Sequence, residues 1–145
     1  MILMVHILVG ALIVLKIKIL WLALLLAFLS HYFLDSLPHW DYSIENIKKR
    51  NWKQTSKEFL IVFFDILTAT ILVLFLSKNI LLSFIGAFFS TLPDGLHLLY
   101  RIWPNKFLKI HQRFHQKINF PRNKISPFWG ILAQIIIISI AIWQF

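Results

Sequence analysis

Long apolar runs separated by short polar segments form the main pattern of this chain. Residues 1–38 contain no Lys or Arg other than Lys16 and Lys18. As one helix they would extend about 57 Å, nearly twice the roughly 30 Å thickness of a bilayer's hydrocarbon core. We therefore predict two short helices, over about 2–15 and 19–37, with a turn at the two lysines. One continuous tilted helix is the alternative.

Three further apolar runs continue the pattern. They predict helices over about 58–77, 80–100 and 128–145. The middle one should be interrupted at Pro93, because proline removes a backbone hydrogen bond and its ring crowds the preceding turn. Before the last run, residues 105–118 alternate apolar and basic positions at helical spacing. This pattern predicts a basic amphipathic helix that lies in the membrane interface.

Composition favours an integral membrane protein. Of the 145 residues, 59% are hydrophobic, which exceeds the roughly 45–50% of soluble domains. We predict an all-α fold in a single membrane domain over 1–145, with about five transmembrane helices and one interfacial helix. The first apolar run has no basic segment before it and no small-residue cleavage site, so we expect a retained span rather than a signal peptide.

The positive charge follows the predicted topology. The formal net charge is +9, which in a soluble protein would suggest a nucleic-acid partner. Here twelve of the fifteen Lys and Arg residues lie in segments 39–57 and 101–126, and only Lys16, Lys18 and Lys78 lie elsewhere. Five alternating spans place those two segments on one side. By the positive-inside rule we predict an inner-membrane protein with a cytoplasmic N-terminus, in contact with anionic headgroups and without nucleic acid.

All the histidines and aspartates fall near the membrane face predicted to be cytoplasmic. Several form pairs three or four residues apart, which places both side chains of a pair on one helix face. Imidazole with carboxylate is a ligand set for zinc, iron or manganese, and the chain has no cysteine that could supply a thiolate. The pairs are His31 with Asp35, Asp94 with His97, and His111 with His115.

Three more residues are weaker candidates. His6 and His39 lie at the same face, and Asp65 lies inside a predicted span, where an ionisable residue is costly unless it is paired. They could bind metal or orient the ligating imidazoles. Alternatively, His6 is incidental, His39 belongs to an interfacial aromatic belt, and Asp65 pairs with a lysine. The candidates outnumber the four ligands of one zinc ion, so we expect one to three divalent ions, zinc first, with manganese or iron as alternatives.

Short motifs resemble those of the YdjM-type membrane-bound metal-dependent hydrolases. That family shows an N-terminal histidine and Leu-Pro-Asp-x-x-His, His-x-x-x-His and Ser-His-x-x-x-Asp elements. The matching residues are His6, "SHYFLD" at 30–35, "LPDGLH" at 92–97 and "HQRFH" at 111–115. The Ser-His element comes first here, whereas it follows in other members, and "HQRFHQK" lacks the family's Thr and Ser. The resemblance implies a metal centre in a membrane protein.

Together these observations predict a membrane-embedded metal-dependent hydrolase, with Asp35 and Asp94 as catalytic ligands. A site at headgroup depth, surrounded by basic residues, suits a phosphoester or a lipid headgroup. A metal-ion or proton transporter and a non-catalytic membrane scaffold are the alternatives. A transporter should place ligands at the bilayer midplane, whereas here the far halves of the spans are nearly free of ionisable residues.

Overall fold

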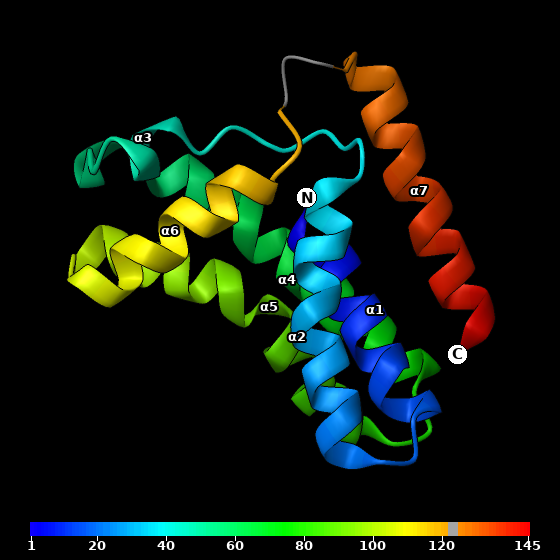
Figure 1. Ribbon diagram of the computed structural model, residues 1–145. Coiled ribbons are helices and arrows are strands. Elements are labelled where there is room, and N and C mark those ends of the chain that lie inside the picture. The colour runs from blue at the N-terminus through cyan, green and yellow to red at the C-terminus, as the bar shows by residue number, and fades with distance from the viewer. Residues whose placement is uncertain (122–124) are drawn as a thin grey trace.

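The computed structural model describes residues 1–121 and 125–145, and every regular element within them is helical (Figure 1). This confirms the all-α prediction. The predicted helix ends differ from the observed ones by no more than two residues, while two short helices in the 39–57 segment were not predicted. The elements are α1 (Leu3–Lys16), α2 (Leu20–Ser36), α3 (Glu45–Lys48), the 3-10 helix η1 (Trp52–Gln54), α4 (Ser56–Leu76), α5 (Ile80–Ile102), α6 (Lys106–Ile118) and α7 (Pro127–Gln144).

Three helices, α4, α5 and α7, are long and apolar enough to cross a membrane. Helices α1 and α2 have 14 and 17 residues, or about 21 and 26 Å, which is shorter than a hydrocarbon core of about 30 Å. The predicted count of five spans is therefore not confirmed. Large apolar side chains face outward, with Phe75 85% exposed and Trp143 82% exposed. Apolar exposure on this scale is typical of a surface that contacts lipid or protein.

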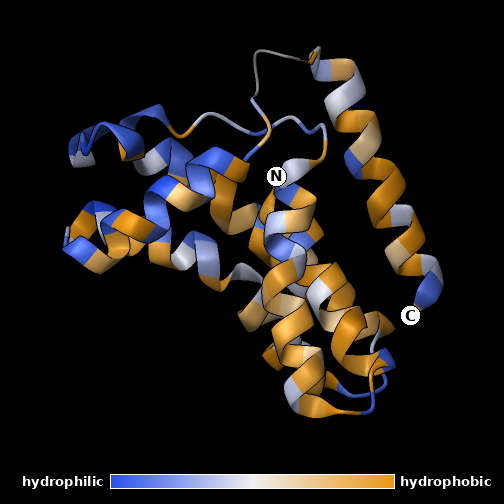
Figure 2. Cartoon of the chain, in the orientation of Figure 1, coloured by the Kyte–Doolittle hydropathy of each residue, from blue (hydrophilic) through white to orange (hydrophobic). Residues whose placement is uncertain are grey.

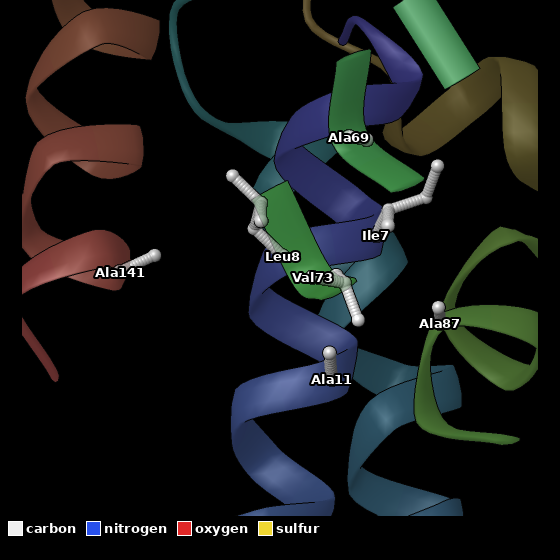
Figure 3. Close-up of a cluster of buried hydrophobic side chains, with 7 residues drawn as sticks. All are labelled: Ile7, Leu8, Ala11, Ala69, Val73, Ala87 and Ala141. Atoms are coloured by element: carbon white, nitrogen blue, oxygen red, sulfur yellow. The ribbon is translucent and has the colours of Figure 1, made fainter. Parts of the chain in front are cut away.

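Helix α1 lies at the centre, and a close approach to α5 fixes its position. A Cβ atom on Gly10 of α1 would collide with the side chain of Ser90, and one on Gly86 of α5 would collide with Val14 and with the Gly10 carbonyl. Glycine at both positions lets the two backbones meet, as small residues do in membrane helix pairs. Around this crossing, small and aliphatic side chains of α1, α4, α5 and α7 form the core drawn in Figure 3.

Helix α5 does not break at Pro93. It stays helical from Ile80 to Ile102 with the proline inside, so the predicted interruption is wrong. A single lost hydrogen bond is tolerated in a helix packed against neighbours, and α5 packs against α1, α2 and α6. Helix α2, in contrast, ends at Ser36, two residues before Pro38, as predicted.

The two basic segments lie together at one end of the molecule. The Arg101 guanidinium donates to the Lys48 carbonyl at 3.1 Å, and Arg50 donates to the Tyr100 carbonyl at 3.2 Å. Figure 2 shows hydrophilic stretches around α3 and α6 and in the loops at the opposite end, while α1, α2 and α7 are mostly hydrophobic. Two of the twelve basic residues, Arg122 and Lys124, lie outside the described residues.

Helix α6 has a protein-facing side and an outward side. Leu108, Gln112 and His115 are buried, whereas Phe107 and Ile110 are exposed. Asn105 caps the helix, since its side-chain oxygen accepts from the Leu108 N–H at 2.8 Å. The outward side can rest in a membrane interface, and the buried side carries one histidine toward the helix bundle.

Candidate metal centre

Four side chains from three helices converge at the end of the bundle that carries the basic segments. Helix α2 supplies His31 and Asp35 from its last turns, α5 supplies Asp94, and α6 supplies His115. One ligand atom from each lies within 4.8 Å of all the others. Two of these residues are remote in sequence from the α2 pair, so the fold alone brings them together. We call these four residues the His/Asp cluster, and they could hold a metal ion.

The spacing within the His/Asp cluster matches the donor set of a four-coordinate ion. Zinc bonds of about 2.0–2.1 Å in a tetrahedron place the ligand atoms about 3.3–3.4 Å apart. Five of the six separations between ligand atoms are 2.9–3.7 Å. His31 Nε2 lies 2.9 Å from His115 Nε2, and Asp35 Oδ2 lies 3.4 Å from His31 Nε2 and 3.2 Å from His115 Nε2. Asp94 Oδ1 lies 3.7 Å from the Nε2 atom of each imidazole. Two imidazoles and two carboxylates at this spacing could therefore hold a divalent metal ion.

The α5 backbone orients His31. Its Nδ1 donates to the Ser90 carbonyl at 2.9 Å. Because a carbonyl can only accept, Nδ1 carries the proton and Nε2 presents its lone pair to the cluster in the neutral ring. The Ser90 hydroxyl in turn donates to the His6 carbonyl at 2.6 Å. The crossing of α1 and α5 thus determines where this imidazole points.

His6 lies behind the His/Asp cluster and is fully buried. Its ring stacks on His31 with a centroid separation of 4.2 Å. Its Nε2 is 3.2 Å from Asp35 Oδ1, yet neither ring nitrogen has a hydrogen-bond partner within the described part of the chain. The structure therefore brings His6 to the centre, where its Nε2 faces the Asp35 carboxylate.

A second group of charges faces the same side of Asp35. The Met1 ammonium donates to Asp35 Oδ1 at 2.7 Å and lies 3.0 Å from Asp41 Oδ1. His39 Nε2 is 3.3 Å from Asp41 Oδ2, and its Nδ1 donates to the Leu37 carbonyl at 2.7 Å. Burial alone would raise the pKa of Asp41, but His39 and the ammonium hold it down at about 2. His39 is thus placed beside Asp41 rather than in the His/Asp cluster.

His97 and His111 lie next to the cluster but bond elsewhere. Arg101 donates to His97 Nε2 at 3.2 Å, and since a guanidinium can only donate, that nitrogen is the acceptor. His111 Nε2 pairs with the Tyr32 hydroxyl at 2.9 Å. Burial, together with the neighbouring imidazole of His115, lowers the pKa of His111. Both rings contact His115, at centroid separations of 5.5 and 5.9 Å.

Asp65 has a different partner from any expected. Its Oδ2 accepts from the Met4 N–H at 3.2 Å, and the Tyr42 hydroxyl lies 3.5 Å from the same oxygen. The first turn of a helix leaves backbone N–H groups without intrahelical partners. The Asp65 carboxylate accepts a hydrogen bond from one of these groups in α1, and its negative charge interacts favourably with the helix dipole. Asp65 therefore holds the start of α1 and lies outside the His/Asp cluster, and the alternative of a lysine partner is not observed among the described residues.

A cavity of about 610 Å³ opens onto the His/Asp cluster, which is within the usual range for a ligand site. Asp35, Asp94 and His115 line it on one side, and Lys48 and Arg101 add positive charge. The Nε of Arg101 has no hydrogen-bond partner among residues 1–121 and 125–145. The rest of the wall is largely apolar, formed mainly by Leu3, Ile44, Ile47, Phe59, Val62, Ile66 and Leu98.

Comparison of the chain with protein-family models, with curated proteins and with solved structures finds no match in any of the three. The resemblance to YdjM-type hydrolases therefore stays a prediction. The function has to be inferred from the geometry of the centre itself.

Several contributing residues were not predicted from the sequence. Ser90 acts through its backbone carbonyl, which no side-chain motif reveals. Arg101 was counted only as topological charge, although its position four residues after His97 places both on one helix face. Gln134 of α7 accepts from the Ile2 N–H at 3.1 Å and donates to the Trp40 carbonyl at 2.8 Å. A glutamine within the apolar stretch of α7 was the available signal.

Proposed function

We propose that this protein is a metal-dependent hydrolase of amphipathic phosphoesters, including lipid headgroups, at the cytoplasmic face of the inner membrane. The observation that carries the proposal is the convergence of His31, Asp35, Asp94 and His115, with one ligand atom of each within 4.8 Å of the others, beside a cavity. A divalent ion bound there would polarise the scissile group and lower the pKa of a bound water. Hydrolysis would transfer hydroxide to phosphorus and the proton to the leaving alcohol.

The cavity supports the choice of substrate. Arg101 and Lys48 line it together with the His/Asp cluster, and a guanidinium with an unpaired Nε–H suits a phosphate oxygen. Apolar side chains cover the remaining wall, where an acyl or alkyl chain could lie. An anionic head beside the centre and a hydrocarbon tail against the wall is the arrangement that an amphipathic phosphoester would adopt.

The charge distribution supports the orientation. The basic residues of α3 and α6 lie at the same end as the His/Asp cluster, because His115 of α6 belongs to the cluster and Lys48 of α3 accepts from Arg101, near the cluster end of α5. A cytoplasmic location of that end follows from the positive-inside rule. The far ends of the helices carry no acid or histidine, which favours a one-sided enzyme site over a transport path.

Metal binding and hydrolysis by the purified protein in detergent test the proposal together. We expect zinc to co-purify and inorganic phosphate to be released from dodecyl phosphate, or an alcohol from a short-chain phospholipid. Asp94→Asn should abolish both the bound metal and the hydrolysis. The control is Glu45→Gln, an exposed acid paired only with Lys49 at 3.7 Å, which should change neither. Absence of metal from the wild-type protein would refute the proposal.

Arg101 supplies a second, independent arm. Arg101→Gln should raise KM for dodecyl phosphate and leave bound zinc unchanged, because Arg101 contacts His97 and the Lys48 carbonyl but none of the four converging ligands. An unchanged KM would mean that the anionic group binds elsewhere and would remove the phosphoester assignment.

A further inference from the structure

The two carboxylate oxygens of Asp35 face different partners. Oδ2 faces the imidazoles of His31 and His115 within the His/Asp cluster, at 3.4 and 3.2 Å. Oδ1 points to the other side, 3.2 Å from His6 Nε2 and 2.7 Å from the Met1 nitrogen. A single ion in the cluster uses only one of the two oxygens, and the other remains available to a second cation.

His6 supplies an unsatisfied ligand on that other side. It is 0% exposed, and its ring nitrogens lack hydrogen-bond partners throughout the described residues. The Nε2 to Asp35 Oδ1 separation of 3.2 Å is close to the edge of about 3.3 Å expected between two ligands of one zinc ion.

Positive charge already occupies this position. The Met1 ammonium lies between Asp35 Oδ1 and Asp41 Oδ1, at 2.7 and 3.0 Å. His39 contacts the other oxygen of Asp41 and so keeps Oδ1 directed inward. The surroundings of the ammonium are therefore built for a cation, with two carboxylate oxygens and one imidazole nitrogen.

We propose that the centre holds two divalent ions bridged by Asp35, the second bound by His6, Asp35 Oδ1 and Asp41 in place of the Met1 ammonium. The inference rests on the proposed metal centre and adds a second ion to it. A carboxylate that gives one oxygen to each ion matches the separation of about 3.5–4 Å found in two-metal sites. Such pairs stabilise both the attacking and the leaving oxygen of an in-line displacement, as phosphoester hydrolysis requires.

The stoichiometry of bound metal tests this second site. Metal-free protein in detergent is dialysed against buffered Zn²⁺, and zinc per chain is measured by mass spectrometry. We expect two ions in the wild type and one in His6→Phe, which keeps a somewhat larger aromatic ring without a ligand nitrogen. Asp41 is partly exposed, so Asp41→Asn should fold even if His6→Phe does not. Asp41→Asn should weaken binding of the second ion at least about tenfold and should leave binding of the first ion unchanged.

Proximity of the two ions is the second readout. In protein loaded with Mn²⁺, two ions bridged by Asp35 should give an exchange-coupled electron paramagnetic resonance signal. His6→Phe should convert it to the six-line signal of an isolated ion. Glu45→Gln should keep both the stoichiometry and the coupling.

One zinc per wild-type chain, unchanged in His6→Phe and Asp41→Asn, would overturn the second site and leave the proposed hydrolase intact. Two ions without exchange coupling would also overturn it, because the second ion would then lie elsewhere. No bound zinc at all would refute both this inference and the proposed function.

Discussion

A matched pair of glycine substitutions on α5 isolates the contribution of the α1–α5 contact. Alanine at Gly86 adds a Cβ that collides with Val14 and the Gly10 carbonyl, whereas alanine at Gly95 has no heavy atom within 4 Å of its Cβ. Both changes gain about 0.8–1.0 kcal/mol of helix propensity. Only Gly86→Ala also incurs an overpacking cost, typically about 1–3 kcal/mol. We expect Gly95→Ala to leave the stability unchanged or raise it. Gly86→Ala should give a protein that is less stable than Gly95→Ala.

The difference between the two free energies of unfolding should therefore be about 1–3 kcal/mol, because the propensity gain cancels. Unfolding in mixed micelles with increasing sodium dodecyl sulfate, followed by circular dichroism, measures both values under one condition. Equal stabilities would refute the reasoning, since they would show that α1 and α5 separate at no cost or do not meet at Gly86.

The same pair reports on the metal centre. If α1 and α5 move apart, Ser90 shifts relative to His31, whose Nδ1 it holds at 2.9 Å. Loss of a partner that orients a metal-ligating histidine typically weakens binding by about 10–100-fold. We expect a zinc Kd raised within that range in Gly86→Ala. An unchanged Kd would show that the Ser90 carbonyl does not orient the ligand.

Three further predictions use the centre and the topology. Zinc at a hundredfold excess over Kd should raise the free energy of unfolding by about 2.7 kcal/mol, and chelator should reverse this; Asp94→Asn should respond to neither. Asp35→Asn should be less stable even without metal, by about 3–5 kcal/mol, since it breaks a buried contact with the Met1 ammonium; thermal unfolding of the metal-free proteins compares it with Asp94→Asn. Reporter fusions at residues 50 and 120 should report the same side of the membrane, and opposite sides would refute the topology.

The helices were predictable because their signals are local. Apolar runs bounded by Pro38, by Lys16 with Lys18 and by Asn79 mark ends that backbone chemistry enforces, and the observed ends agree within two residues. The prediction at Pro93 was wrong because the effect of a proline depends on what surrounds the helix. Pro38 follows the end of α2 and lies in a loop. Pro93 is tolerated inside α5, because that helix is packed on several sides.

The composition of the centre was only partly predictable. Spacing alone places Asp94 and His97 on one face of α5, but it does not say how α5 is rotated. The contact at Gly86 sets that rotation and directs Asp94 into the cluster, whereas His97 bonds Arg101, four residues along the same helix. The capping role of Asp65 likewise depends on where α1 begins in space. Distances between helices remote in sequence determine these outcomes, and no local pattern encodes them.

The shortness of α1 and α2 has a consequence for the surrounding bilayer. At about 21 and 26 Å, the two helices are several ångström short of a typical hydrocarbon core. Hydrophobic mismatch of this sign makes lipid thin locally, at a cost of fractions of a kcal/mol per ångström. A dimple over α1 and α2 would lower nearby headgroups toward the depth of Asp35. Acyl-chain length would then affect how closely headgroups approach Asp35, and a protein of this shape would gather in the thinner regions of its membrane.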